Sequence, residues 1–347
     1  SSAASDVYKR QPYNVARRLA SLDLISKGRA GWNVVTSGDA GTAGNYGRDE
    51  HYDYDTRYAR AQEHVQVVQG LWHSYEDDAF PRDRATGQFL DPSKLHALNH
   101  KGEHFSVVGP LNIQRSPQGQ PVIFQAGDSQ QGRDLGAATA DVIFTHAASV
   151  EQGQAFYRDV KARAARLGRD PEQLLVLPGA EIYVGDTDEH AREIERHYHQ
   201  QDHSFALALK EFGRNFGWHD FSQYELDAPF PQQSLEYARS SFFTNAKRIA
   251  DQAREQGFSL RQAVEFGRQL RPGAFVGSAE TVAAKMADWF QARALDGFNI
   301  YIGHPGQFRR FTEEVVPLLQ ARGVYRTAYE GSTLRESLGL QIPQFRQ

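Results

Sequence analysis

Short apolar runs alternate along this chain with segments whose apolar residues recur at helical spacing. The short runs predict strands at 31–35, 121–127, 140–147, 174–185 and 297–303. The helical spacing predicts helices at 13–26, 55–75, 129–139, 150–167, from about 188, at 278–295 and at 308–321. Loop residues dominate 77–120, with a hairpin predicted around 104–108. Residues 200–275 are rich in aromatics and helical pattern but poor in strands, which indicates an insertion.

Continuous apolar strands separated by helices are typical of parallel pairing with crossover helices. The pattern gives five strands, each followed by a helix. That is fewer than the about eight βα units that close a barrel. Two architectures therefore remain open: a doubly wound open sheet, or a barrel that lacks its beginning.

The first predicted strand runs into a glycine-rich loop at 37–47 that has no hydrophobic pattern. Thr36 and Ser37 stand at the strand end, where parallel α/β folds bind ligands, although small polar residues also simply begin loops. On the following helix, Tyr54 and Tyr58 share a face at i, i+4 spacing. The two phenols either hydrogen-bond a ligand or pack half-buried, which is commoner for tyrosine on a helix.

The sharpest local feature is the segment QAGDSQQGRDLG at 125–136. Ser129 stands where a helix should begin, so its hydroxyl and the free N–H groups there predict a phosphate cradle. Gly127 would let a ligand approach the backbone. The plainer alternative is an ordinary helix cap, because Asp and Ser are favoured caps anywhere. Asp128 argues against an anion site if its carboxylate faces the anion, and is neutral if it points away.

Composition narrows the class of protein. The formal charge is −4 over 347 residues, and the basic residues are scattered, so no nucleic-acid partner is expected. No run of about 18 apolar residues exists, so no membrane span is expected. The absence of cysteine excludes disulfides and thiolate chemistry. No secretory signal is evident, which favours the cytoplasm, and residues 1–11 fit no targeting pattern and are interpreted as a non-native leader.

Motifs for several common chemistries are missing. There is no P-loop, no G-x-G-x-x-G after a strand and no G-x-S-x-G. His199 and His203 lie at i, i+4, but without a third ligand they indicate a solvated helix face, and no metal site is predicted. No catalytic acid or base can be named; His96, His100 and His146 qualify only because they lie near predicted loops or strand ends.

An ordered series of segments carries a family resemblance. GRAGWNVVTS is followed by NYGRDEHYDYDTRYARAQEHVQVVQGLWHSYEDDA, HKGEHFSVVGPLN and PVIFQAGDSQQGR, and later by DGFNIY and YRTAYEGSTLRESLGL. Over residues 13–342 the chain resembles the flavin-dependent monooxygenases of the nitrilotriacetate monooxygenase, pristinamycin synthase and dibenzothiophene-sulfone monooxygenase group. This group belongs to the bacterial-luciferase-like superfamily.

The resemblance implies a (β/α)8 TIM barrel with a helical insertion before the last strand, which corresponds to about 200–275. Family members carry roughly three further βα units before the segment that begins at 13. The chain is therefore expected to be a leader, 1–11, followed at 12–347 by a barrel that lacks about its first three βα units.

The resemblance also implies a site for FMN. The family's phosphate contact falls on Ser129, beside Gly127 and Asp128. The family's tyrosine in the helix that follows the glycine-rich loop falls on Tyr58. Tyr54 occupies a position that is usually histidine in the family, and a phenol does not titrate near neutral pH. The isoalloxazine side of the flavin is expected to be lined by residues of the first predicted strand and its end. These residues are Asn33, Thr36 and Ser37.

The implied reaction is two-component oxygenation. A separate NADH- or NADPH-dependent flavin reductase supplies FMNH2, and the reduced flavin uses O2 to oxidise a small organic nitrogen or sulfur compound. Barrels of this group commonly pair, so a homodimer is expected. Two alternatives stay open: a deazaflavin-dependent oxidoreductase on the same fold, and an inactive fragment whose missing units expose apolar strand faces and sheet edges.

Overall fold

A computed structural model describes residues 2–6, 11–37, 40–201, 205–239, 242–269, 273–301 and 305–345. Its main element is a sheet of seven strands, and the described strands of this sheet pair in parallel. The strands are β1 (Ser2–Asp6), β2 (Gly31–Val35), β5 (Val122–Ala126), β6 (Val142–Thr145), β7 (Leu175–Val184), β8 (Gly273–Gly277) and β9 (Asn299–Tyr301). They follow the order β1-β2-β5-β6-β7-β8, with β9 also paired to β7.

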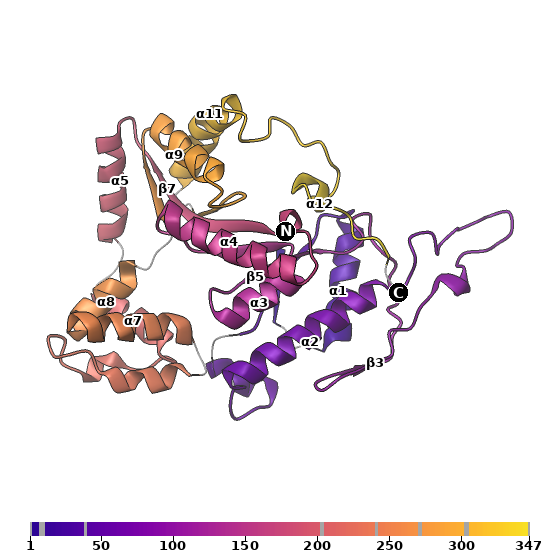
Figure 1. Cartoon of the computed structure of the whole chain (residues 1–347), viewed down its shortest axis with the longest axis horizontal. Coiled ribbons are helices and arrows are strands. Elements are labelled where there is room, and N and C mark those ends of the chain that lie inside the picture. The colour runs from indigo at the N-terminus through magenta and orange to yellow at the C-terminus, as the bar shows by residue number, and fades with distance from the viewer. Residues whose placement is uncertain are drawn as a thin grey trace.

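The helices that connect the strands match the predicted crossovers. They are α1 (Pro12–Ile25), α2 (Tyr54–Trp72), α3 (Gln130–Thr139), α4 (Val150–Arg166), α5 (Asp188–Gln201) and α9 (Ala279–Gln291). Helices α3 and α4 lie together over the sheet, and α1 packs along α2 (Figure 1). The predicted last helix is α10 (Pro305–Arg310) and α11 (Val316–Ala321), joined through a π-helical turn at Phe311–Val315.

The predicted insertion contains α6 (Phe205–Asn215), α7 (Phe243–Gln256) and α8 (Leu260–Gln269). These helices gather at one end of the molecule (Figure 1) and bury their own aromatic cluster, which includes Phe212, Phe216 and Phe221. The insertion therefore does not depend on the sheet for its core. Among the described residues, no helix combines the length and apolarity needed to cross a membrane.

Two expectations about the sheet differ from the structure. The segment set aside as a leader contributes β1, which pairs with β2 from Ser2↔Gly31 to Asp6↔Val35. The predicted insertion ended at 275 without strands, whereas β8 occupies Gly273–Gly277; its short apolar run between two glycines gave too weak a pattern. The hairpin predicted around 104–108 is confirmed, and it joins β3 (His100–Lys101) to β4 (Ser106–Val107).

The expected barrel is confirmed only as a mostly parallel sheet with helices. Among the described strands, β1 does not pair with β8 or β9, so these strands do not close a ring. The division into leader and barrel stays a prediction.

A buried ion pair ties the last helix, α12 (Leu334–Ser337), to the amino-terminal side of the sheet. The Arg335 guanidinium donates two hydrogen bonds to the Asp141 carboxylate, at 3.1 and 2.7 Å. The Arg335 side chain is 2% exposed and that of Asp141 is 13% exposed. Gln118 extends the network, because it accepts from the Arg335 backbone N–H and donates to Asp23, whose pKa burial raises.

We expect Arg335→Met to lower the free energy of unfolding by about 3–5 kcal/mol, because it leaves a buried carboxylate without its cation. Urea denaturation followed by circular dichroism measures this. Arg261→Met is the control: the Arg261 and Asp227 side chains are 45% and 81% exposed. Its cost should stay below about 1 kcal/mol. Equal costs for the two variants would contradict the proposed importance of the buried pair.

Candidate active site

A cavity of about 350 Å³ lies where β2, β5 and β6 end, and it brings together all the residues that the sequence predicted for a flavin site. The register explains this convergence, since Val34 pairs with Gln125 and Ala126 with Phe144, so the three strands end at one edge. The lining residues that had been predicted are Asn33, Thr36, Ser37, Tyr54, Tyr58, Gly127, Asp128 and Ser129.

Helix α2 supplies the phenols. Asp53 caps it by accepting from the Thr56 backbone N–H at 2.9 Å. The Tyr54 and Tyr58 rings then pack against each other with centroids 4.9 Å apart. Burial raises the pKa of Tyr54 to about 12, although the Ser129 hydroxyl beside it acts in the opposite direction. The Tyr54 hydroxyl is thus a neutral, buried group that makes no hydrogen bond of ordinary geometry among the described residues.

Helix α3 points its amino terminus at the cavity. The Ser129 hydroxyl accepts from the Gly132 N–H at 3.0 Å, so the plain capping role is confirmed. The cap does not exclude a ligand, because a capping hydroxyl keeps its own proton to donate and the first helical N–H groups have no partner within the helix.

Gly127 is needed for a reason other than the one predicted. A Cβ at Gly127 would lie 2.9 Å from the Gly132 Cα, and a Cβ at Gly132 would lie 2.9 Å from the Gly127 Cα. The two glycines let the end of β5 and the first turn of α3 meet backbone to backbone. The contact that Gly127 demonstrably serves is therefore helix packing, and it places the α3 amino terminus at the cavity.

Asp128 is held by the neighbouring strand. Its Oδ1 accepts from the Thr145 hydroxyl at 2.7 Å, and its Oδ2 lies 4.0 Å from His146 Nδ1. Arg133 Nε donates to the Asp128 carbonyl at 2.9 Å. The carboxylate is therefore occupied on the β6 side, which answers the objection that it would face an anion at α3.

Arg57 lines the cavity and was not predicted from sequence. It is 4% exposed, and its Nη1 donates to the Ser37 carbonyl at 3.1 Å. Its guanidinium carbon lies 5.3 Å from the centre of the Tyr54 ring. The i, i+3 spacing from Tyr54 was a usable signal, because it puts Arg57 on the helix face that carries the phenols.

Ser37 has a strained backbone. Its φ is 50°, a left-handed value that costs a non-glycine residue of order 1 kcal/mol or more. The hydrogen bond from Arg57 to the Ser37 carbonyl contacts this left-handed residue directly. Other lining residues come from distant segments, and sequence spacing gave no means of finding them: Phe144, Phe242, Phe243, Thr244 and Asn245.

The three histidines named as acid–base candidates lie in different places. His96 and His100 bind Glu76 and Glu63, each at 2.9 Å, and neither lines the cavity, whereas His146 does. No group of three or more potential metal ligands occurs among the described residues. His203 and the side chain of His199, whose i, i+4 spacing was considered for zinc binding, lie outside the described part of the chain.

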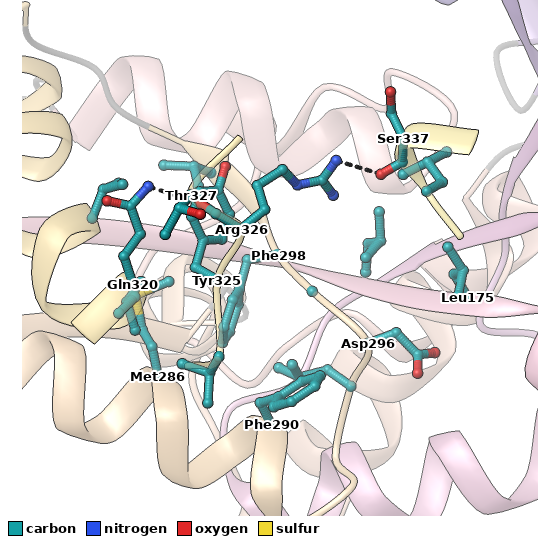
Figure 2. A pocket seen from close by; sticks show the side chains of 18 of the residues that line it. Leu175, Met286, Phe290, Asp296, Phe298, Gln320, Tyr325, Arg326, Thr327 and Ser337 are labelled. Atoms are coloured by element: carbon teal, nitrogen blue, oxygen red, sulfur yellow. Dashed lines mark hydrogen bonds between the residues drawn. The ribbon is translucent and has the colours of Figure 1, made fainter. Parts of the chain in front are cut away.

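A larger cavity, of about 740 Å³, lies near the start of β7, against α9 and α11 (Figure 2). Its walls include Leu175, Met286 and Phe298. Polar groups there bind one another: Gln320 donates to the Arg326 carbonyl, and Arg326 donates to the Ser337 carbonyl (Figure 2). Ligands of parallel α/β folds bind at the carboxyl ends of strands, so the smaller cavity is the better active-site candidate.

Comparison with known proteins agrees with the predicted resemblance. The model of the family "Luciferase-like monooxygenase" matches residues 1–296. The chain is 44% identical over 345 residues to N-acetyl-S-(2-succino)cysteine monooxygenase of Bacillus subtilis (strain 168), covering 99% of this chain and 77% of that protein. It is 42% identical over 337 residues to nitrilotriacetate monooxygenase component A of Aminobacter aminovorans, covering 96% and 74%.

The fold is also similar to that of a solved enzyme structure. Riboflavin lyase, described as containing modified FMN and riboflavin, matches with a TM-score of 0.85 at 32% identity, over 99% of this chain and 75% of that one. The alignment with the Bacillus subtilis relative covers 99% of this chain and 77% of that protein, and the family model also matches the segment interpreted as a leader.

We expect Gly132→Ala to destabilise the fold by about 1–3 kcal/mol, although alanine favours helices, because its Cβ would press on the Gly127 backbone. Chemical denaturation measures the change. Gly44→Ala is the control, since a Cβ there meets nothing within 4 Å, and it should change stability by less than about 0.5 kcal/mol. A Gly132→Ala variant as stable as the parent would show that the two backbones can separate freely.

Proposed function

The chain belongs to the luciferase-like monooxygenase family, and on that premise we propose that it is the oxygenase of a two-component system. It binds FMNH2 in the cavity at the ends of β2, β5 and β6. It then uses O2 to oxidise a small organic nitrogen or sulfur compound. The observation that carries this proposal is the meeting of a helix amino terminus, neutral hydroxyls and a buried arginine in one cavity.

The cavity fits the phosphate of FMN. Helix α3 offers N–H groups and a partial positive charge, and Ser129 and Tyr54 offer hydroxyls that stay neutral. The buried Tyr54 hydroxyl has no ordinary hydrogen bond of its own, so a ligand oxygen would satisfy it. Arg57 adds a buried cation on the same wall, which suits a phosphate dianion.

The other wall suits a flat ring system. Asn33 and Thr36 extend from β2, and Phe144 faces the cavity from β6. Phe242 and Phe243, at the start of α7, line the cavity from the insertion. Bound FMNH2 would supply the reaction with O2, while these residues hold and orient it.

Relatives indicate the substrate class and the partner. Two relatives are named for N-acetyl-S-(2-succino)cysteine and nitrilotriacetate, which are small acids containing sulfur or nitrogen. We propose a substrate of this kind for the chain. The name "component A" points to a second component, and we propose an NAD(P)H-dependent flavin reductase in that role. The cytoplasmic location and the homodimer stay predictions.

We expect Ser129→Ala to weaken FMN and FMNH2 binding at least about tenfold, because it removes a hydroxyl from the phosphate cradle. Quenching of tyrosine and tryptophan fluorescence during titration gives Kd. Ser149→Ala is the matched control: Ser149 caps α4 by accepting from the Gln152 N–H, but it does not line the cavity. Both variants lose a helix cap, and only Ser129→Ala should lose flavin affinity.

The same titration separates the alternatives. Preference for a deazaflavin over FMN would favour the hydride-transferring oxidoreductase, although the relatives described above are named as monooxygenases. A folded chain that binds neither flavin would overturn the proposed function for this polypeptide. Equal affinities of the two serine variants would overturn the assignment of the phosphate to α3.

A further inference from the structure

Of the histidines in the described chain, His146 is the one that lines the cavity. His146 lies at the end of β6 and lines the cavity, with a side chain that is 46% exposed. We propose that His146 is the proton-transferring residue of this site and that Asp128 positions it. The inference rests on the proposed function, because it assumes that reduced flavin and O2 react in this cavity.

The geometry is that of an oriented acid–base group. Asp128 Oδ2 lies 4.0 Å from His146 Nδ1, while Oδ1 is fixed by the Thr145 hydroxyl at 2.7 Å. The Phe144 ring meets the imidazole edge to face, with centroids 4.8 Å apart and planes at 82°. The Phe144 ring packs against the imidazole, and the Asp128 carboxylate lies beside Nδ1 beyond hydrogen-bond distance. Since Nδ1 faces Asp128, Nε2 is the nitrogen left for the cavity.

Two other histidine–carboxylate pairs in the described chain serve the fold. His100 bonds Glu63 at 2.9 Å, and the same carboxylate accepts from two backbone N–H groups of the β3–β4 hairpin. His96 bonds Glu76 at 2.9 Å away from the cavity. His146 and His190 both keep a longer pairing to a carboxylate and an accessible ring, but of these histidines only His146 lines the cavity.

The chemistry requires such a group. Without substrate, FMNH2 and O2 give FMN and H2O2; with substrate, they give FMN, H2O and a product that carries one oxygen atom. In both cases hydrogen from the flavin ends on oxygen, so protons must move within the cavity. His146 Nε2 accepts a proton and returns one, and the residue ends the cycle unchanged.

The first test needs no turnover. The intact chain is treated with diethyl pyrocarbonate with and without saturating FMN, and carbethoxylated histidines are located by peptide mass spectrometry. His190 is the matched control: its side chain is 44% exposed and lies 3.5 Å from Asp186, but it is outside the cavity. FMN should protect His146 at least about fivefold and His190 not at all. Equal modification of His146 with and without FMN would remove it from the flavin site.

The second test follows reoxidation of bound FMNH2 by O2 in a stopped-flow spectrophotometer, through the absorbance of oxidised FMN. At saturating FMNH2, His146→Asn should slow reoxidation about 10²-fold or more, the usual effect of losing an acid–base group. Added imidazole should restore part of the rate to His146→Gly. Asp128→Asn should slow reoxidation less than His146→Asn, and Asp128→Glu should recover part of that loss. His190→Asn should match the parent.

The outcomes are distinct. A parent chain that binds no FMN overturns the proposed function. Normal FMN binding with an undiminished reoxidation rate in His146→Asn overturns this inference and leaves the proposed function standing. A slowed rate that imidazole does not restore in His146→Gly would also overturn it, because it would indicate a shape requirement rather than proton transfer.

Discussion

The parallel hydrogen-bonded register of β2, β5 and β6 is the constraint on which the site depends. Each strand pairs with its neighbour so that Val34 lies beside Gln125 and Ala126 beside Phe144. Their carboxyl ends therefore meet at one edge, and the segments that follow must share it. Ser37, Ser129 and His146 are up to 109 residues apart in sequence, yet they line one cavity because of this alignment.

The two ends of the sheet handle charge differently. At the amino-terminal side, Arg335 and Asp141 neutralise each other in a buried pair that fastens the C-terminal segment. At the carboxyl side, Arg57 is buried beside neutral hydroxyls, and the Asp128 carboxylate is drawn toward Thr145. One end uses its charges to hold the fold, while the other places a buried cation and hydroxyls around a cavity.

The insertion contributes to the site without supporting the sheet. Its own aromatic cluster gives α6, α7 and α8 an independent core. Residues 242–245 can therefore border the cavity from outside the sheet. This arrangement suits a family whose members act on different small compounds, since a wall outside the sheet can vary in sequence without disturbing the strands that end at the cavity.

The sequence by itself determined the elements and the chemistry that depends on near neighbours. Apolar runs located β2, β5, β6 and β7, helical spacing put Tyr54 and Tyr58 on one face, and cap chemistry placed Ser129 at the start of α3. It failed where the local signal was weak or set aside, at β8 and β1.

Only the tertiary structure decided which of these groups meet. It buried Arg57, assigned Gly127 to the contact with Gly132, turned Asp128 toward β6 and distinguished His146 from His96 and His100. The physical reason is range. Periodicity and capping depend on residues three or four positions apart, whereas burial, charge pairing and the choice of a site histidine depend on contacts that only the packed strands and helices create.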